Sequence, residues 1–200
     1  MSSGRSADRI EFLRRLRVIR RFTTEPIPQV VVGDVLEVAR WSGSSANRQP
    51  WELILVRDRA RMRALSEVGD SPGLIPLADA ALVLVPVLTR SGAELDAGRL
   101  LERIMLAASA HGVGSTPAGF GAATFAAKKL LGVPAPYGLR VAVALGYPAD
   151  ATARLVSVER DVDTRLPLGR LPVGRRPLAE ILHFEHYGRG AAAGPVPGKA

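Results

Sequence analysis

The sequence predicts a single mixed helix-and-sheet domain, an α+β or α/β sandwich. Three apolar stretches of strand length, 51–56, 80–88 and 141–145, alternate with segments whose apolar residues recur at helical spacing. The chain has 200 residues, of which 47% are hydrophobic and 23% charged, so it is large enough to bury a core. The absence of internal repeats also favours one folded unit.

Six stretches are predicted to form helices from their apolar spacing and their capping residues. They are 6–19, 29–41, 59–67, 94–111, 122–131 and 177–182. The longest carries Leu101, Ile104 and Met105 at spacings of three and four, so it is expected to be the central core helix. The first carries apolar residues on one face with arginines between them, which predicts an amphipathic helix.

Segments rich in small, polar and turn-forming residues separate these elements. The stretch 42–50 is predicted to be a polar loop, 69–76 a mobile loop and candidate lid, and 115–121 a loop of small residues. Pro86 lies inside the second predicted strand and indicates a bulge or an edge position. The low-complexity end, 188–200, is predicted to be a disordered tail, which leaves 1–187 as the folded domain.

Several classes of protein are excluded or disfavoured by missing features. With no cysteine, the chain has no disulfide, no thiolate metal site and no cysteine nucleophile. It contains no P-loop, nucleophile elbow or dinucleotide-binding glycine motif, and its three histidines lack the spacing of a known zinc site. No apolar run is long enough to span a membrane and no secretory signal is evident, so a cytoplasmic protein without a membrane partner is expected.

The net charge of +8 raises the question of a nucleic-acid partner, because seven arginines lie between Arg5 and Arg21. Nucleic-acid grooves usually add stacking aromatic residues or a recognised fold, and only 5% of this chain is aromatic. We therefore expect no nucleic-acid partner. The simpler interpretation is a solvated helix whose last turn supplies cations to one bound phosphate, although a basic binding module remains an alternative.

Five blocks of sequence, taken in order, resemble the flavin-dependent nitroreductase family. They are RVIRRFTTEPIP (17–28), WSGSSANRQPWELILVRD (41–58), AASAHGVGSTPAGF (107–120), ALGYP (144–148) and GRRPLAEILHFEHYG (174–188). Each block alone is common, but the five together cover nearly the whole chain. The resemblance implies an α+β sandwich with a central, mainly antiparallel sheet flanked by helices, forming an intertwined homodimer.

The same resemblance implies FMN at two sites, each built from both subunits, with NAD(P)H as the electron donor. The implied reaction is ping-pong reduction of a small electrophile such as a nitroaromatic compound or a quinone. Because the cofactor performs the chemistry, no catalytic side chain is assigned. NADH, NADPH and a deazaflavin donor remain open, as does the physiological acceptor.

The resemblance assigns the phosphate and ribityl chain of FMN to the first block and to the last. In this register Arg17 and Arg20 match two binding positions, whereas Leu16 and Val18 replace an arginine and a serine of the family pattern. Each lost charge-assisted contact would cost roughly 1.5–3 kcal/mol. The two basic residues of the last block, Arg175 and Arg176, are predicted to offset part of this loss.

Two further segments match family motifs around the flavin ring. Ser44, Ser45 and Asn47 match the loop that in the family reaches the flavin of the other subunit, although these residue types also favour ordinary turns. A second match runs along the isoalloxazine edge, where a backbone N–H or the Thr116 hydroxyl is expected to bond N5. It consists of Ser115, Thr116, Pro117, Ala118 and Gly119.

The main alternative is a flavin-binding or other ligand-binding protein of the same fold that lacks efficient turnover. Leu16 and Val18 motivate this alternative, because a weakened phosphate site would favour storage or a different ligand. A hydroxyl at Thr116 also resembles the dehalogenase branch of the superfamily, which leaves the class of acceptor open.

Overall fold

The structure, a computed structural model, describes residues 3–69, 72–149 and 178–188. By its internal contacts the chain divides into two compact units, Met1–Arg154 and Leu155–Ala200. The described part of the second unit contains the short helix α7 (Leu178–Ile181), which confirms the helix predicted at 177–182. In the same unit the rings of His183 and Tyr187 lie 4.5 Å apart.

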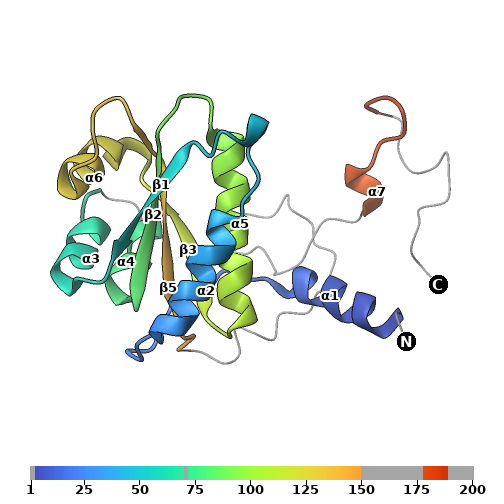
Figure 1. The fold of residues 1–200 in the computed structure, drawn as a ribbon, viewed down its shortest axis with the longest axis horizontal. Helices are drawn as coiled ribbons and strands as arrows, with labels where there is room; N and C mark the ends of the chain where they lie inside the picture. The colour runs from blue at the N-terminus through green and yellow to red at the C-terminus, as the bar shows by residue number, and fades with distance from the viewer. Residues whose placement is uncertain (1–2, 70–71, 150–177, 189–200) are drawn as a thin grey trace. The chain divides into compact units, whose positions relative to one another are not determined.

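The first unit contains the sheet and the remaining helices (Figure 1). In chain order its elements are α1 (Ser3–Arg15), α2 (Gln29–Arg40), β1 (Trp51–Val56), α3 (Arg59–Ser66), α4 (Pro76–Asp79), β2 (Leu82–Leu88), α5 (Glu94–Ala110), β3 (Gly114–Gly119), α6 (Thr124–Leu131), β4 (Gly138–Leu139) and β5 (Val141–Gly146). Short 3₁₀ turns lie at Ser45–Asn47, Pro72–Leu74 and Gly121–Ala123. The three predicted strands and the helices predicted at 29–41, 59–67, 94–111 and 122–131 are confirmed.

The strands form one sheet in the order β1-β2-β5-β3, with β4 also paired to β2. Every strand pair is antiparallel, which confirms the mainly antiparallel sheet implied by the family resemblance. Strand β3 is therefore an edge strand of this path. Its position matters for the site, because an edge strand presents backbone groups to other segments or to ligands.

Helices cover both faces of the sheet (Figure 1). Side chains alternate along β2, so Val83 and Val85 pack in the core beneath α3, α4 and α6, whereas Leu82 and Leu84 pack in the core beneath α2 and α5. Leu100 and Ile104 of α5 are completely buried in the second core. The expectation that 94–111 forms the central core helix is therefore confirmed.

Pro86 lies within the interior strand β2, so the predicted edge position is wrong. It stands opposite Leu53 of β1. On the other side, β2 pairs with β5 only from Leu82 to Leu84 and with β4 from Val87 onward. The proline therefore falls where the ladder passes from one partner strand to the next, and a missing N–H is tolerated there.

The predicted loop at 115–121 is wrong over most of its length, because Gly114–Gly119 is strand β3. Glycine, serine and proline are poor strand formers, but β3 pairs with all six residues of β5. Pro117 is exposed, so its lack of an N–H does not leave a buried ladder incomplete. Tertiary pairing has overridden local propensity.

The predicted helix 6–19 ends early, at Arg15. The residues that follow are extended and lie beside the sheet: Val18 bridges Ser115 in parallel and Phe22 bridges Pro148. The Ile19 N–H donates to the Ser115 carbonyl at 2.8 Å, and Ile19 is buried. Burial of Ile19 against β3 therefore competes successfully with continuation of the helix.

The predicted lid at 69–76 is wrong for its second half. Leu74 is completely buried, and Pro76 and Leu77 at the start of α4 are buried as well. Leu74 and Leu77 belong to the core between the sheet and helices α3 and α6. A segment that contributes such side chains to the core cannot open without exposing them to water.

We predict that Gly114→Ala destabilises the fold by about 1–3 kcal/mol, because overpacking forces atoms apart. An added Cβ would lie 2.9 Å from Cβ and Cγ1 of Ile19, the residue that joins the extended segment to β3. Gly119→Ala in the same strand is the matched control, since its Cβ would meet nothing within 4 Å. Urea unfolding measures both, and equal stabilities of the two variants would contradict the prediction.

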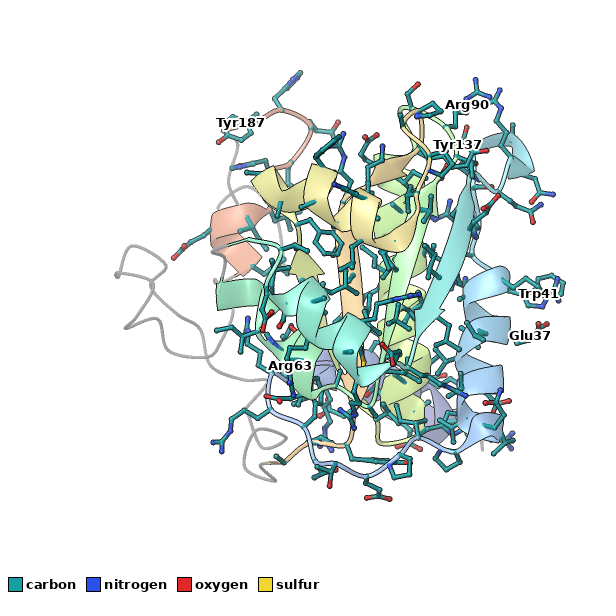
Figure 2. All side chains as sticks on the ribbon, turned by 90° about the vertical axis from the view of Figure 1, so that its left-hand side faces the viewer. Glu37, Trp41, Arg63, Arg90, Tyr137 and Tyr187 are labelled. Atoms are coloured by element: carbon teal, nitrogen blue, oxygen red, sulfur yellow. The ribbon has the colours of Figure 1, made fainter. Side chains whose placement is uncertain are left out.

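The end of α2 carries an exposed side-chain cluster that titrates at an unusual pH. Hydrogen bonds from Arg40 and from Trp41 Nε1 lower the pKa of Glu37 from 4.5 to about 2. The Arg40 guanidinium also lies 5.1 Å from the centre of the Trp41 ring. Figure 2 shows Glu37 and Trp41 together on this helix.

Because the pKa of Glu37 is lowered in the folded protein, this cluster stabilises the helix end above pH 4.5 and loses that effect as the pH falls towards 2. In a Trp51→Phe background, we expect Trp41 fluorescence to change with a midpoint near pH 2. Circular dichroism separates this change from global unfolding. The variant Glu37→Gln should lack the transition, and a midpoint near 4.5 would contradict the assignment.

Candidate functional site

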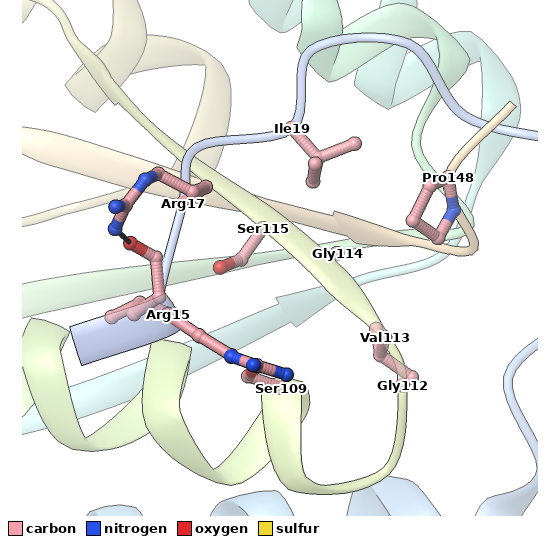
Figure 3. Close-up of a pocket in the computed structure, with 10 residues that line it drawn as sticks. Arg15, Arg17, Ile19, Ser109, Gly112, Val113, Gly114, Ser115 and Pro148 are labelled. Carbon is pink, nitrogen blue, oxygen red and sulfur yellow. Dashed lines mark hydrogen bonds between the residues drawn. The ribbon is translucent and has the colours of Figure 1, made fainter. Parts of the chain in front are cut away.

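A pocket of about 290 Å³ opens between the end of α1, the end of α5 and the start of β3 (Figure 3). It is lined by Arg15, Leu16, Arg17, Ile19, Ser109, Gly112, Val113, Gly114, Ser115 and Pro148. Most of these residues come from two of the sequence blocks singled out above, 17–28 and 107–120. The pairing of Ile19 with Ser115 is what brings the two blocks together.

Two arginines contribute to the wall of this pocket. Arg15, the last residue of α1, is exposed, and its Nε donates to Glu11 Oε1 at 2.6 Å. Arg17 is half-buried, and its Nη1 donates to the carbonyls of Arg14 and Leu16, both at 2.7 Å. Arg17 therefore also satisfies carbonyls at the C-terminal end of α1. Two guanidinium groups and the nearby Ser115 suit a small anion.

The remaining predicted phosphate ligands are not gathered in this pocket. Arg20 is exposed and does not line it. Of the two residues that replace family ligands, Leu16 lines the pocket but also packs partly against the core under α2 and α5, and Val18 is 37% exposed and does not line the pocket. Arg175 and Arg176 lie outside the described residues, so their predicted role is not tested.

The predicted ring-binding residues lie along the outer edge of β3. Because the Ser115 carbonyl accepts from Ile19, backbone groups at every second residue, 115, 117 and 119, point away from β5. Pro117 and Gly119 are exposed, whereas Thr116 and Ala118 are 2% and 1% exposed. Pro117 has no N–H, so the outward-facing donor on this stretch is the Gly119 N–H.

The buried position of Thr116 bears on its predicted role. Its hydroxyl donates only a long hydrogen bond, 3.5 Å, to the Pro117 carbonyl. The Gly119 N–H is therefore better placed than the Thr116 hydroxyl to meet a planar ligand at this edge. The distance from Ser115 to Gly119 is about 13 Å at the usual rise per strand residue, enough to separate a phosphate site from a ring site.

The loop after α2, 42–50, is exposed along most of its length and adopts an unusual conformation. Ala46, Asn47 and Gln49 have φ angles of 50°, 53° and 48°, in the left-handed region. Such angles in residues other than glycine cost on the order of 1–3 kcal/mol each and are common at functional sites. The Gln49 N–H donates to Ser44 Oγ at 2.8 Å, and Gln49 Nε2 contacts the Asn47 carbonyl at 3.2 Å. These bonds hold the predicted site residues in one arrangement.

Helix α5 separates this loop from the pocket. The loop bonds to Asp96 near the start of the helix, whereas Ser109 near its end lines the pocket. Thirteen residues of α-helix span about 20 Å. The loop of one chain therefore lies far from the pocket of the same chain. Figure 1 shows α5, the helix that runs between them.

The described residues show no sign of a metal centre or a membrane span. Among them, no group of three or more histidine, aspartate or glutamate side chains is placed to hold a metal ion. His111 instead pairs with Asp34, with Nε2 and Oδ2 3.0 Å apart, and ties α5 to α2. Within the same residues, no helix is both long enough and apolar enough to cross a membrane.

Comparison with protein families gives a match to the nitroreductase family over residues 13–71 and 77–147, well over half of the chain. The chain belongs to the nitroreductase family. The matched residues include the pocket arginines, the exposed loop after α2 and strand β3. The resemblance inferred from the five sequence blocks is therefore confirmed.

Individual relatives agree with this assignment. An NADH dehydrogenase from Thermus thermophilus is 29% identical over 197 residues, covering 80% of this chain and 92% of that protein. An FMN-dependent nitroreductase structure from Clostridium difficile has a TM-score of 0.71 at 22% identity, covering 89% of this chain and 99% of that one. NADPH:FMN oxidoreductase from Vibrio harveyi, complexed with NAD⁺, has a TM-score of 0.70 at 19% identity, with coverages of 89% and 77%. At these identities the two structures show a shared fold.

Sequence reasoning about this nitroreductase-family chain missed two features of the site. Arg15 contributes to the pocket, but it lies one position before the family's phosphate-binding position and was counted only as a helix residue. Asp96 is 8% exposed and bonds the loop 51 residues earlier in sequence. No local pattern could indicate that contact, because it depends on how α5 packs beside the loop.

Proposed function

We propose that this nitroreductase-family protein is an FMN-dependent oxidoreductase that takes hydride from NAD(P)H and reduces a small electrophile by a ping-pong mechanism. The observation that carries the proposal is the arginine-lined pocket at the start of β3, continuous in sequence with the exposed strand edge at Pro117 and Gly119. The relatives named above as an NADH dehydrogenase and as an FMN-dependent nitroreductase support the same activity.

The residues present fit the chemical groups of FMN in part. Arg15 and Arg17 supply positive charge for the phosphate, and Ser115 supplies a hydroxyl for the phosphate or the ribityl chain. The exposed edge of β3 offers the Gly119 N–H and the Pro117 carbonyl to a ring system. The pocket of about 290 Å³ is slightly below the usual range for a complete small-molecule site.

A second subunit would complete the site. The loop carrying Ser44, Ser45 and Asn47 lies about 20 Å along α5 from the pocket of its own chain, too far to touch a flavin bound there. In a homodimer with antiparallel α5 helices, the loop of one subunit would lie beside the pocket of the other. The exposed apolar residues Ile10 and Leu13 of α1, 57% and 52% exposed, would also gain a partner.

Bound FMN would supply the redox chemistry, accepting hydride from the nicotinamide and passing electrons to the acceptor. The chain's own residues would then bind and orient. The arginines hold the phosphate, the β3 edge sets the position of the ring, and the partner's loop limits access to it. No protein acid or base is required, so the protein can accept nitroaromatic compounds, quinones or related electrophiles whose shape fits the open ring face.

One observation favours the alternative of a flavin-binding protein without efficient turnover. Leu16 contributes to the core and cannot act as a phosphate ligand, and Val18 offers no hydroxyl. A site that has lost these two contacts would hold FMN less tightly. Anaerobic reduction separates this alternative from the enzyme.

We expect purified protein to show oxidised-flavin absorption after incubation with FMN and desalting, and to bleach when NADH or NADPH is added without oxygen. Steady-state double-reciprocal plots for donor and acceptor should then be parallel, as a ping-pong mechanism requires. Flavin absorption without bleaching would favour the storage alternative. Protein that stays colourless after incubation would refute the proposed function.

We also expect Arg15→Ala to weaken FMN binding about tenfold while leaving the affinity for riboflavin unchanged, because riboflavin lacks the phosphate. Arg14→Ala is the matched control, since Arg14 also pairs with Glu11, at 3.6 Å, but does not line the pocket. Fluorescence titration of the unmodified protein and of both variants with FMN and with riboflavin measures the dissociation constants. An equal loss for FMN and riboflavin would show that Arg15 acts on the fold and not on the phosphate.

A further inference from the structure

Asp96 is a nearly buried carboxylate 51 residues away in sequence from the loop residue that it contacts, Ser45. It lies in the first turn of α5 and is 8% exposed. The Ser45 N–H donates to both of its oxygens, at 3.2 Å to Oδ1 and 3.4 Å to Oδ2. A buried carboxylate is costly to desolvate unless it receives hydrogen bonds. The contact with the Ser45 N–H offsets part of this cost, so it favours one position of the loop backbone at Ser45.

A second residue of α5 holds the loop one turn further along. A Cβ built on Gly43 would lie 2.3 Å from Nη2 and 3.0 Å from Cζ of Arg99, so the guanidinium rests directly on the Gly43 backbone. Any side chain at position 43 would displace it. Asp96 and Arg99 thus contact the loop at Ser45 and at Gly43, where its exposed stretch, 45–49, begins.

The exposed part of the loop needs such an anchor. Ala46, Asn47 and Gln49 all have left-handed backbone conformations, and they follow immediately after the residue that bonds Asp96. Strained conformations of this kind persist only when the surrounding contacts determine them. Without a fixed N–H at Ser45, the loop could relax to unstrained conformations in which Ser44 and Asn47 point elsewhere.

We propose that Asp96 is a positioning residue for flavin binding, which fixes the loop 42–50 through the Ser45 N–H and so presents Ser44, Ser45 and Asn47 to the flavin of the partner subunit. Arg99 supports the same arrangement from its place over Gly43. This proposal rests on the proposed function, because it takes the loop to be part of a flavin site. Asp96 itself does not touch the flavin.

The test compares Asp96→Ala with Glu102→Ala, which removes an exposed carboxylate from the same helix. We expect Asp96→Ala to raise the Kd for FMN about ten- to a hundredfold, the usual effect of losing a hydrogen bond to a charged group. Hydrogen exchange in a peptide covering 42–50 should quicken while exchange in β1 and α5 stays unchanged. Glu102→Ala should leave both quantities within about twofold of the unmodified protein.

Asp96→Asn provides a conservative rescue. Its amide oxygen can still accept from Ser45 without a charge, so its Kd for FMN should rise only about three- to tenfold. At saturating FMN, the visible circular dichroism of the bound flavin should shift in the order unmodified protein, Asn variant, Ala variant, because the spectrum reports how the flavin is surrounded. A purely structural role for Asp96 would not produce this order in folded, saturated protein.

Unchanged loop exchange and unchanged FMN affinity in Asp96→Ala would overturn the proposal. If Asp96→Ala does not fold, loop exchange and FMN affinity are measured on Asp96→Asn instead. The proposal is overturned if both quantities are unchanged in that variant. Protein that binds no FMN at all would refute the proposed function. In that case, quicker exchange confined to 42–50 in Asp96→Ala would still support Asp96 as the anchor of the loop. Unchanged exchange would refute that role too.

Discussion

The site depends on the pairing of one extended segment with the ends of two strands. The Ile19 N–H bonds the Ser115 carbonyl and the Thr23 N–H bonds the Tyr147 carbonyl, both at 2.8 Å. Glycines at 114 and 146 make this approach possible, since a Cβ at either would lie 2.9 Å from Ile19 or Phe22. Because the segment is held there, α1 must end at Arg15, and its last residues form one wall of the pocket.

In the homodimer proposed above, helix α5 would determine how the parts of the site are shared between subunits. Its first turn holds the strained loop through Asp96, and its last turn faces the pocket through Ser109. One rigid helix therefore keeps the two parts about 20 Å apart. Because this exposed and strained loop lies too far from the pocket of its own chain to reach it, the proposed homodimer assigns the loop to the pocket of a second copy of the chain.

Much of this architecture followed from the sequence, and the exceptions share a cause. Apolar spacing predicted α2, α3, α5 and α6 and the strands β1, β2 and β5, because each buries a regular apolar face. The predictions of a loop at 115–121 and of a first helix reaching residue 19 were wrong, because pairing between distant segments overrode local propensity there. Family motifs indicated the loop and the β3 edge, but Arg15 and Asp96 could be found only from the packing of helices against those segments.

The two arginines of the pocket would supply positive charge for the proposed FMN phosphate despite Leu16 and Val18. The C-terminal end of a helix carries negative partial charge, which repels an anion. Arg17 offsets it by bonding the carbonyls of Arg14 and Leu16, and Arg15 adds a further cation at the same helix end. Both contributions require α1 to be helical up to Arg15. A 13-residue helix with an exposed apolar face is marginal alone, so a partner subunit that covers that face would stabilise α1 and strengthen the anion site together.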